Sequence, residues 1–179
     1  SGLTAGAALG GVLVAVISDG LKDRRHIAHE RAAREAERHT TAATRRRTFE
    51  VENLIAAYDG LWLLARESAK IHMVDRRAAE SAEHGYGGTL LPPGTEVDAT
   101  AGNQAIKAIR LILDNDVRQL ALSAHEAMCV ASMLGTRAKI FETGPVSLAE
   151  GDRAAAQVAF SADAALKAIA DRIRILAAE

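Results

Sequence analysis

The residues with the clearest metal-binding chemistry are two histidines near the start of the chain. His26 and His29 are three residues apart with Glu30 beside them, so two imidazoles would share one face of a helix. His39 is too far along the chain to complete the set. A zinc site needs three or four ligands, and two are too few. We therefore expect surface histidines on a charged helix, and we predict no metal and no other cofactor.

A second pair with chemical potential lies further along the chain. His125 and Cys129 are spaced i,i+4, but a nucleophilic cysteine also needs an orienting acid and an oxyanion site. The simpler interpretation is a histidine at the border of the core and a small buried thiol. The chain has no Glu-x-x-His sequence and no glycine motif for phosphate binding or for a nucleophile elbow. We predict no catalytic residues.

Basic residues gather in the first third of the chain. Residues 1–47 hold nine Lys/Arg against five Asp/Glu, whereas the rest of the chain is acidic. Glutamates are interleaved with the arginines and no aromatic residues accompany them, which argues against nucleic acid. Basic clusters beside an apolar segment fit anionic lipid headgroups or an acidic partner, and a solvated helix face is the alternative. The predicted contact residues are Lys22, Arg24, Arg25, Arg45, Arg46 and Arg47.

Residues 3–18 form an uncharged segment that ends abruptly at Asp19 and the basic residues beyond it. A membrane-spanning helix needs about 20 apolar residues, with a lower limit of about 17. The segment lacks the basic start and the cleavage site of a signal peptide. Positive charges on its C-terminal side predict a single-pass anchor with the C-terminal body in the cytoplasm.

Small residues in this segment also favour close helix packing. Gly2, Gly6 and Gly10 repeat every four residues, which lets two backbones approach each other. The predicted membrane or oligomer packing residues are Gly2, Leu3, Gly6, Gly10, Val12 and Val14. In the alternative interpretation, the segment packs on protein within a soluble or virion assembly.

The remaining chain predicts an all-α fold. An apolar helix (1–19) leads into a basic charged stalk (20–47) and a helical bundle (48–179). Within the bundle we expect three long antiparallel helices over 48–83, 104–134 and from the Ser147–Glu150 capping box to about 176. The glycines and prolines of 84–103 predict a loop between the first two.

Apolar periodicity assigns a core face to each predicted helix. On the first helix, the inward stripe is expected to comprise Val51, Leu54, Ile55, Tyr58, Trp62, Ala65, Ala69 and Met73. Leu63, Leu64, Ile71 and Val74 lie nearly opposite, so this helix is either central in a bundle or shared with another chain. The next helices are expected to bury Ile106, Ile109, Leu113, Val117, Leu120, Ala124, Met128 and Ala131, and then Val158, Ala162, Ala165, Ile169, Ile173 and Leu176.

The order of these features resembles a group of small actinobacterial proteins. The resemblance rests on the Gly/Ala-rich start, the sequence Asp23-Arg24-Arg25-His26, the stretch Phe49–Tyr58, and the sequence Arg110–Leu113 with Val117. Members of the group have one N-terminal membrane anchor and a cytoplasmic helical domain, and their function is unassigned. The long Gly/Pro loop is a departure from this pattern.

These observations favour a non-enzymatic, membrane-anchored helical scaffold or interaction protein that acts as a homo-oligomer. Its protein partner is not specified by the sequence. One alternative is a structural subunit of a phage or virion assembly. The other is an enzyme with a site between the helices, roofed by the loop.

Overall fold

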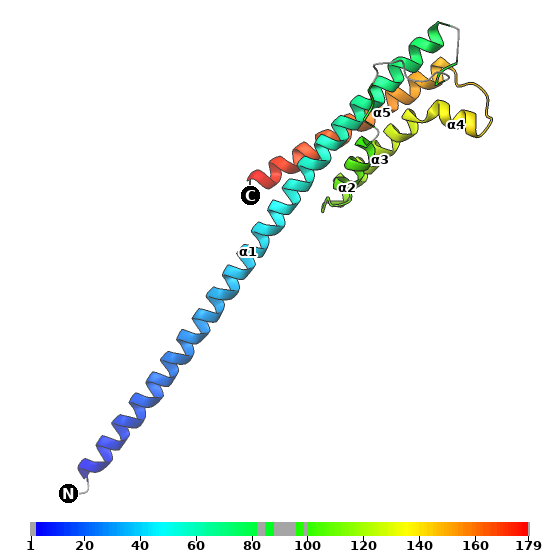
Figure 1. Cartoon of the computed structure of the whole chain (residues 1–179). Helices are drawn as coiled ribbons and strands as arrows, with labels where there is room; N and C mark the ends of the chain where they lie inside the picture. The colour runs from blue at the N-terminus through cyan, green and yellow to red at the C-terminus, as the bar shows by residue number, and fades with distance from the viewer. Residues whose placement is uncertain (1–2, 82–84, 88–95, 99, 179) are drawn as a thin grey trace. The chain divides into compact units, whose positions relative to one another are not determined.

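The described part of the chain is helical (Figure 1). A computed structural model describes residues 3–81, 85–87, 96–98 and 100–178, with side chains from residue 26 on apart from residue 28. The helices are α1 (Leu3–Glu80), α2 (Ala101–Ile109), α3 (Asn115–Ser132), α4 (Leu134–Ile140) and α5 (Leu148–Ala178). Over the described ranges the only β pairing is a single bridge between Tyr86 and Val146. The prediction of an all-α fold is confirmed.

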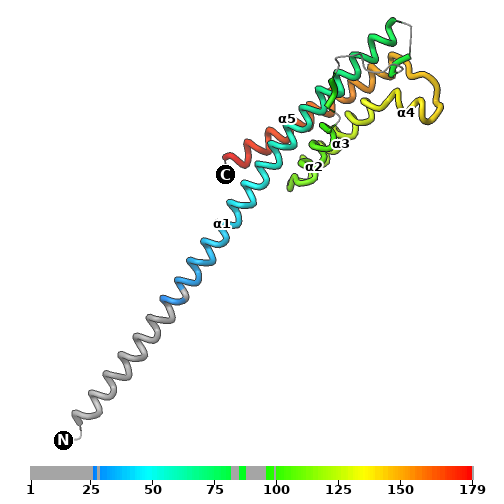
Figure 2. Tube along the Cα trace, viewed as in Figure 1, coloured from blue at the N-terminus to red at the C-terminus, as the bar shows by residue number. Residues whose placement is uncertain are grey.

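The predicted apolar segment, stalk and first bundle helix belong to one helix, α1. The absence of proline and the presence of a single glycine, Gly60, between residues 21 and 83 explain why the helix continues. The chain divides into two compact units, Ser1–Arg46 and Arg47–Glu179. Figure 2 shows the chain from blue to red, with the uncertain residues in grey.

The first unit is exposed wherever its side chains are described, over residues 26–46 apart from 28. Glu30 pairs with His26 (3.4 Å) and with Arg34 (3.6 Å), each at i,i+4 spacing. Such exposed pairs each stabilise a helix by about 0.2–0.5 kcal/mol, so they are a small contribution to this segment. The ion pair between Glu30 and Arg34 agrees with the predicted charged, solvated stalk.

In the second unit, α5 runs antiparallel to α1 (Figures 1 and 2). Arg172 near the end of α5 binds Glu50 (2.8 Å), and Asp152 near its start lies 3.4 Å from Arg76. A reciprocal capping box begins α5, because Ser147 N–H donates to Glu150 (2.8 Å) and Glu150 N–H donates to the Ser147 hydroxyl (3.3 Å). The predicted capping box is therefore present.

The predicted single helix over 104–134 is wrong. The chain leaves helix α2 after Ile109, and Asp114 begins α3 by accepting from the backbone N–H groups of Asp116 and Val117. An aspartate before a helix is a strong N-cap, and the sequence interpretation passed over it. Gly135, predicted to end this helix, instead lies inside α4.

Residues 96–98 and 100–114 lie along α1 and run antiparallel to it, and we call them the descending arm. Asp98 N–H donates to Glu67, and a Cβ added to Gly60 would lie 2.8 Å from the Ala105 Cα. The arm ends beside Arg172, which is 3.8 Å from Asp114. The order along the chain is α1 up, this arm down, α3 up and α5 down. The predicted loop 84–103 therefore overlaps the start of α2, and residues 96–98 of that loop contact α1.

Glu67 holds this arm in place. Its side chain is 3 % exposed and accepts from Lys70 (2.9 Å) and from the backbone N–H of Asp98 (3.2 Å). The hydrogen bond from Lys70 is the main reason that the pKa of Glu67 is lowered. Lys70 also donates to the carbonyl of Glu96 (3.1 Å). A charged carboxylate thus fixes residues 96–98, because its hydrogen bonds offset its desolvation.

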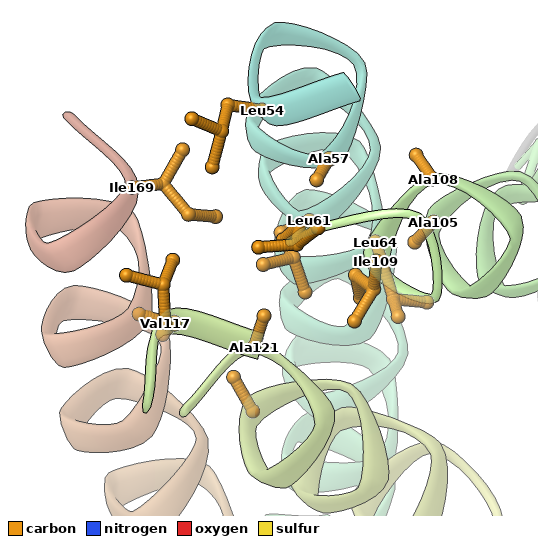
Figure 3. Close-up of a cluster of buried hydrophobic side chains, with 14 of the residues drawn as sticks. Leu54, Ala57, Leu61, Leu64, Ala105, Ala108, Ile109, Val117, Ala121 and Ile169 are labelled. Atoms are coloured by element: carbon orange, nitrogen blue, oxygen red, sulfur yellow. The ribbon is translucent and has the colours of Figure 1, made fainter. Parts of the chain in front are cut away.

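The core of the second unit combines side chains from α1, α2, α3 and α5 (Figure 3). Its largest fully buried side chains are Leu54, Leu61, Ile109, Ile112, Met128 and Ile169. The inward stripe predicted for the last helix is confirmed for Val158, Ala162, Ala165, Ile169 and Leu176. Leu113 and Leu120, predicted to be core residues, are 39 % and 43 % exposed. The interruption between α2 and α3 changes the faces on which they lie.

The inward face of α1 also differs from the prediction. Leu54, Ala57, Leu61 and Leu64 are buried, whereas Ile55, Trp62 and Met73 are about half exposed (48 %, 52 % and 48 %). Of the predicted inward residues, Leu54 is buried, and Val51, Tyr58 and Ala65 are partly buried against the core. The buried face is centred on Ala57, Leu61 and Leu64 instead of Ile55 and Trp62, because α2 approaches α1 closely at Gly60 and Ala105.

Candidate functional site

Most predicted packing and lipid-contact residues lie outside the described side chains. These are Gly2, Leu3, Gly6, Gly10, Val12, Val14, Lys22, Arg24 and Arg25. Of the remaining predicted contacts, Arg45 and Arg46 are exposed and Arg47 is half-buried. The exposed pair is accessible to an anionic partner.

The predicted anchor and the predicted surface histidines differ in how much of them the structure describes. Among the residues whose side chains are described, no helix combines the length and the apolar character that a membrane crossing requires. The predicted anchor over 3–18 lies outside those residues. Across the same described residues, no group of three His, Cys, Asp or Glu side chains is arranged to hold a metal ion.

His125 and Cys129 are adjacent but are not arranged as a nucleophile and its base. His125 Nε2 donates to the carbonyl of Gly102 at 2.9 Å, and the Cys129 Sγ is 3.8 Å from the same nitrogen. Burial raises the pKa of the Cys129 thiol, which keeps it protonated. The geometry gives no support to a reactive thiolate here.

An apolar stripe on α1 lies at the border of the core, and we call it the outer stripe. It comprises Val51, Ile55, Tyr58, Trp62, Ala65, Ala69 and Met73. Val51, Tyr58 and Ala65 are partly buried against the core, whereas Ile55, Trp62 and Met73 are about half exposed. Trp62 is its largest exposed side chain, and the guanidinium carbon of Arg66 lies 5.6 Å from the centre of a Trp62 ring. Beside Ile55 and Tyr58, a shallow cavity of 320 Å³ reaches Ala170 and Ile173 of α5. A half-exposed apolar stripe of this length is typical of an interaction surface.

A second hollow lies between α1, α3 and α5, and we call it the alanine cavity. Its volume is 230 Å³, and its walls are mainly small apolar side chains. The lining residues are Ala65, Ser68, Ala69, His72, Tyr86, Ala131, Ala155, Val158, Ala159 and Ala162. Alanines on three helices at one level leave space that larger side chains would fill.

One end of the alanine cavity is polar. His72 Nδ1 is 2.8 Å from the Tyr86 hydroxyl, and His72 Nε2 is 3.7 Å from Asp152. With the imidazole proton on Nε2, the Tyr86 O–H donates to Nδ1 and the N–H faces Asp152. Burial, with the charges of Asp75 and Asp152, raises the pKa of Tyr86 to about 12. The phenol is therefore neutral near pH 7 and can donate or accept a hydrogen bond.

Close glycine contacts hold Tyr86 at this end. A Cβ added to Gly151 of α5 would lie 2.3 Å from the Tyr86 ring, and one added to Gly87 would lie 2.5 Å from the Gly135 Cα. Tyr86 also bridges to Val146. The described segment 85–87 of the predicted loop is therefore a docked element that closes the cavity.

Two buried polar side chains near the cavity have no hydrogen bond to any residue that the structure describes. Ser68 is 5 % exposed and lines the cavity, and among the described residues its hydroxyl has no hydrogen-bond partner. Asp75 is 7 % exposed, and burial raises its pKa against the favourable charges of His72 and Lys139. A buried hydroxyl without a partner costs about 1–3 kcal/mol.

The sequence interpretation missed this constellation. It weighed His26, His29, His39 and His125 but not His72, whose i−4 neighbour is Ser68 and whose i+3 neighbour is Asp75. That spacing of a hydroxyl, an imidazole and a carboxylate on one side of the helix was the available signal. The pairing with Tyr86 had no local signal, because it depends on how the loop returns to α1.

Comparison of the chain with protein-family models, with curated proteins and with solved structures finds no match.

Proposed function

We propose that the chain is a non-enzymatic helical scaffold that self-associates through the outer stripe and is held at a membrane by its N-terminal segment. The observation that carries the proposal is the exposure of Ile55 and Trp62 within the outer stripe. The members of this stripe follow the alternating spacing of four and three residues from Val51 to Ala69, which is the spacing of a coiled-coil seam.

A second copy of the chain is the occupant that fits this stripe best. Every position from Val51 to Ala69 in the seam is uncharged, so parallel pairing in register places no like charges opposite each other. Ile55 and Trp62 would become buried against the same residues of the second copy. Two copies anchored in one membrane by their N-termini must also be parallel, so the two parts of the proposal are consistent.

Substitution within the outer stripe tests the self-association. Because each large apolar side chain contributes about 1.5–3 kcal/mol on burial, Ile55→Ser with Trp62→Ser is expected to raise the dissociation constant at least about 100-fold. The measurement is sedimentation equilibrium of the full chain, with circular dichroism to check the helical content.

The matched control replaces two leucines of similar exposure elsewhere, Leu111→Ser with Leu120→Ser (48 % and 43 % exposed). This control is expected to leave the association unchanged. Equal weakening by both pairs, or a monomeric wild-type chain, would show that the outer stripe is not the association surface.

The anchor is supported by the uncharged run 3–18 and by the basic residues that follow it. The full chain is expected in the membrane fraction, extractable by detergent but not by high salt, and a chain lacking residues 1–20 in the soluble fraction. Release of the full chain without detergent would contradict the anchor. Large soluble particles in that case would favour the structural-subunit alternative.

A further inference from the structure

We infer that the alanine cavity binds a small neutral amphiphile, with an apolar body between α1 and α5 and one hydroxyl or carbonyl head at Ser68, His72 and Tyr86. This binding function is different from self-association through the outer stripe, although Ala65 and Ala69 belong to both surfaces. It rests on the cavity, on a buried Ser68 hydroxyl that bonds to no described residue, and on the charges around the polar end.

The size of the cavity sets the size of the ligand. An apolar cavity of about 150 Å³ stays dry and binds benzene, so 230 Å³ accepts a somewhat larger molecule. Pockets for drug-sized ligands begin at about 300 Å³, which sets an upper limit. A six-carbon alcohol lies between these limits.

The walls and the head site specify the chemistry of the ligand. The apolar body would contact Ala131, Val158 and Ala162, which offer no hydrogen bonds from their side chains. Ser68 supplies a donor and an acceptor that no described residue satisfies, and the Tyr86 hydroxyl has acceptor capacity left after it bonds His72. A single hydroxyl or carbonyl would satisfy this end.

The charges at the polar end disfavour a charged ligand. Asp75 and Asp152 lie near the Tyr86 hydroxyl and would repel a carboxylate. Both carboxylates already have a cationic neighbour, because Arg76 is 3.4 Å from Asp152 and the charge of Lys139 acts on Asp75. A cationic ligand is therefore not favoured either. A neutral head therefore enters without leaving a charge unpaired.

Titration of the full chain with 1-hexanol, hexanoate and hexane tests the proposal. Backbone amide chemical shifts around Ser68, Ala131 and Val158 locate the binding. We expect saturable binding of 1-hexanol, at least about tenfold weaker binding of hexanoate, and about fivefold weaker binding of 1-hexanol to Ser68→Ala. Hexane is expected to bind wild type and Ser68→Ala equally.

Two leucine variants separate cavity binding from partition into lipid. Ala159→Leu places a larger side chain at the rim and is expected to weaken 1-hexanol binding at least about tenfold. Ala156→Leu, on the same helix but outside the cavity lining, is expected to bind as wild type does. Thermal melts of both variants check folding. Shifts that do not saturate, equal binding of alcohol and carboxylate, or unchanged binding to a folded Ala159→Leu would overturn the proposal.

Discussion

Replacing Arg172 with alanine is expected to lower the free energy of unfolding by about 3 kcal/mol. Arg172 donates to Glu50 at 2.8 Å, and the Glu50 carboxylate is 5 % exposed. Without the guanidinium, a negative charge stays buried between α1 and α5 without its partner. Arg172 also lies 3.8 Å from Asp114, so its loss weakens the start of α3 as well. Urea denaturation followed by circular dichroism measures the change.

Lys167→Ala is the matched control on the same helix. Lys167 pairs with Asp171 at 3.3 Å, but its side chain is 75 % exposed, and such pairs contribute about 0–1 kcal/mol. Adding Glu50→Gln to Arg172→Ala is expected to recover part of the lost stability, because a neutral amide is easier to bury than a carboxylate. If Arg172→Ala and Lys167→Ala have the same effect, the buried pair does not stabilise the bundle.

Substitution by alanine at two neighbouring residues of α1 is expected to change the free energy of unfolding by very different amounts. Leu61 is fully buried, and Leu61→Ala is expected to destabilise the second unit by about 3 kcal/mol through lost contacts and a residual cavity. Trp62 is 52 % exposed, and Trp62→Ala is expected to cost less than about 1 kcal/mol in the monomer. Both changes introduce the same helix-forming residue at adjacent positions, so helix propensity does not explain the difference.

The comparison is made at a protein concentration at which the wild type is monomeric, because self-association would add to the apparent stability. A larger loss for Trp62→Ala than for Leu61→Ala would mean that α1 faces the core with the stripe predicted from the sequence. In that case the outer stripe would not be available to a second copy.

The contrast between Leu61 and Trp62 shows what the spacing of apolar residues can predict about a helix and what it cannot. Apolar spacing predicted that α1 is an amphipathic helix and correctly placed Leu54 inside. Spacing alone did not fix the centre of the buried face, because that centre depends on which side of α1 α2 can approach. Gly60 and Ala105 permit that close approach, and the contact joins residues far apart in the sequence.

The same reasoning explains what was predictable of the candidate site. The core face of α5 followed from its sequence, since one side of that helix is apolar and it packs along its length. The break before Asp114 was readable as a local N-cap but was overlooked. The alanine cavity was not predictable, because it is a gap left where small residues of three helices meet. Tyr86 reaches it through the packing of Gly87 on Gly135 and of its own ring on Gly151.

The bond between Glu50 and Arg172 also bears on the order of events in folding. It joins residues 122 positions apart, so it forms only after the intervening chain has been brought together. Contacts that form after the transition state affect the unfolding rate more than the folding rate. We therefore expect Arg172→Ala to raise the unfolding rate more than it lowers the folding rate.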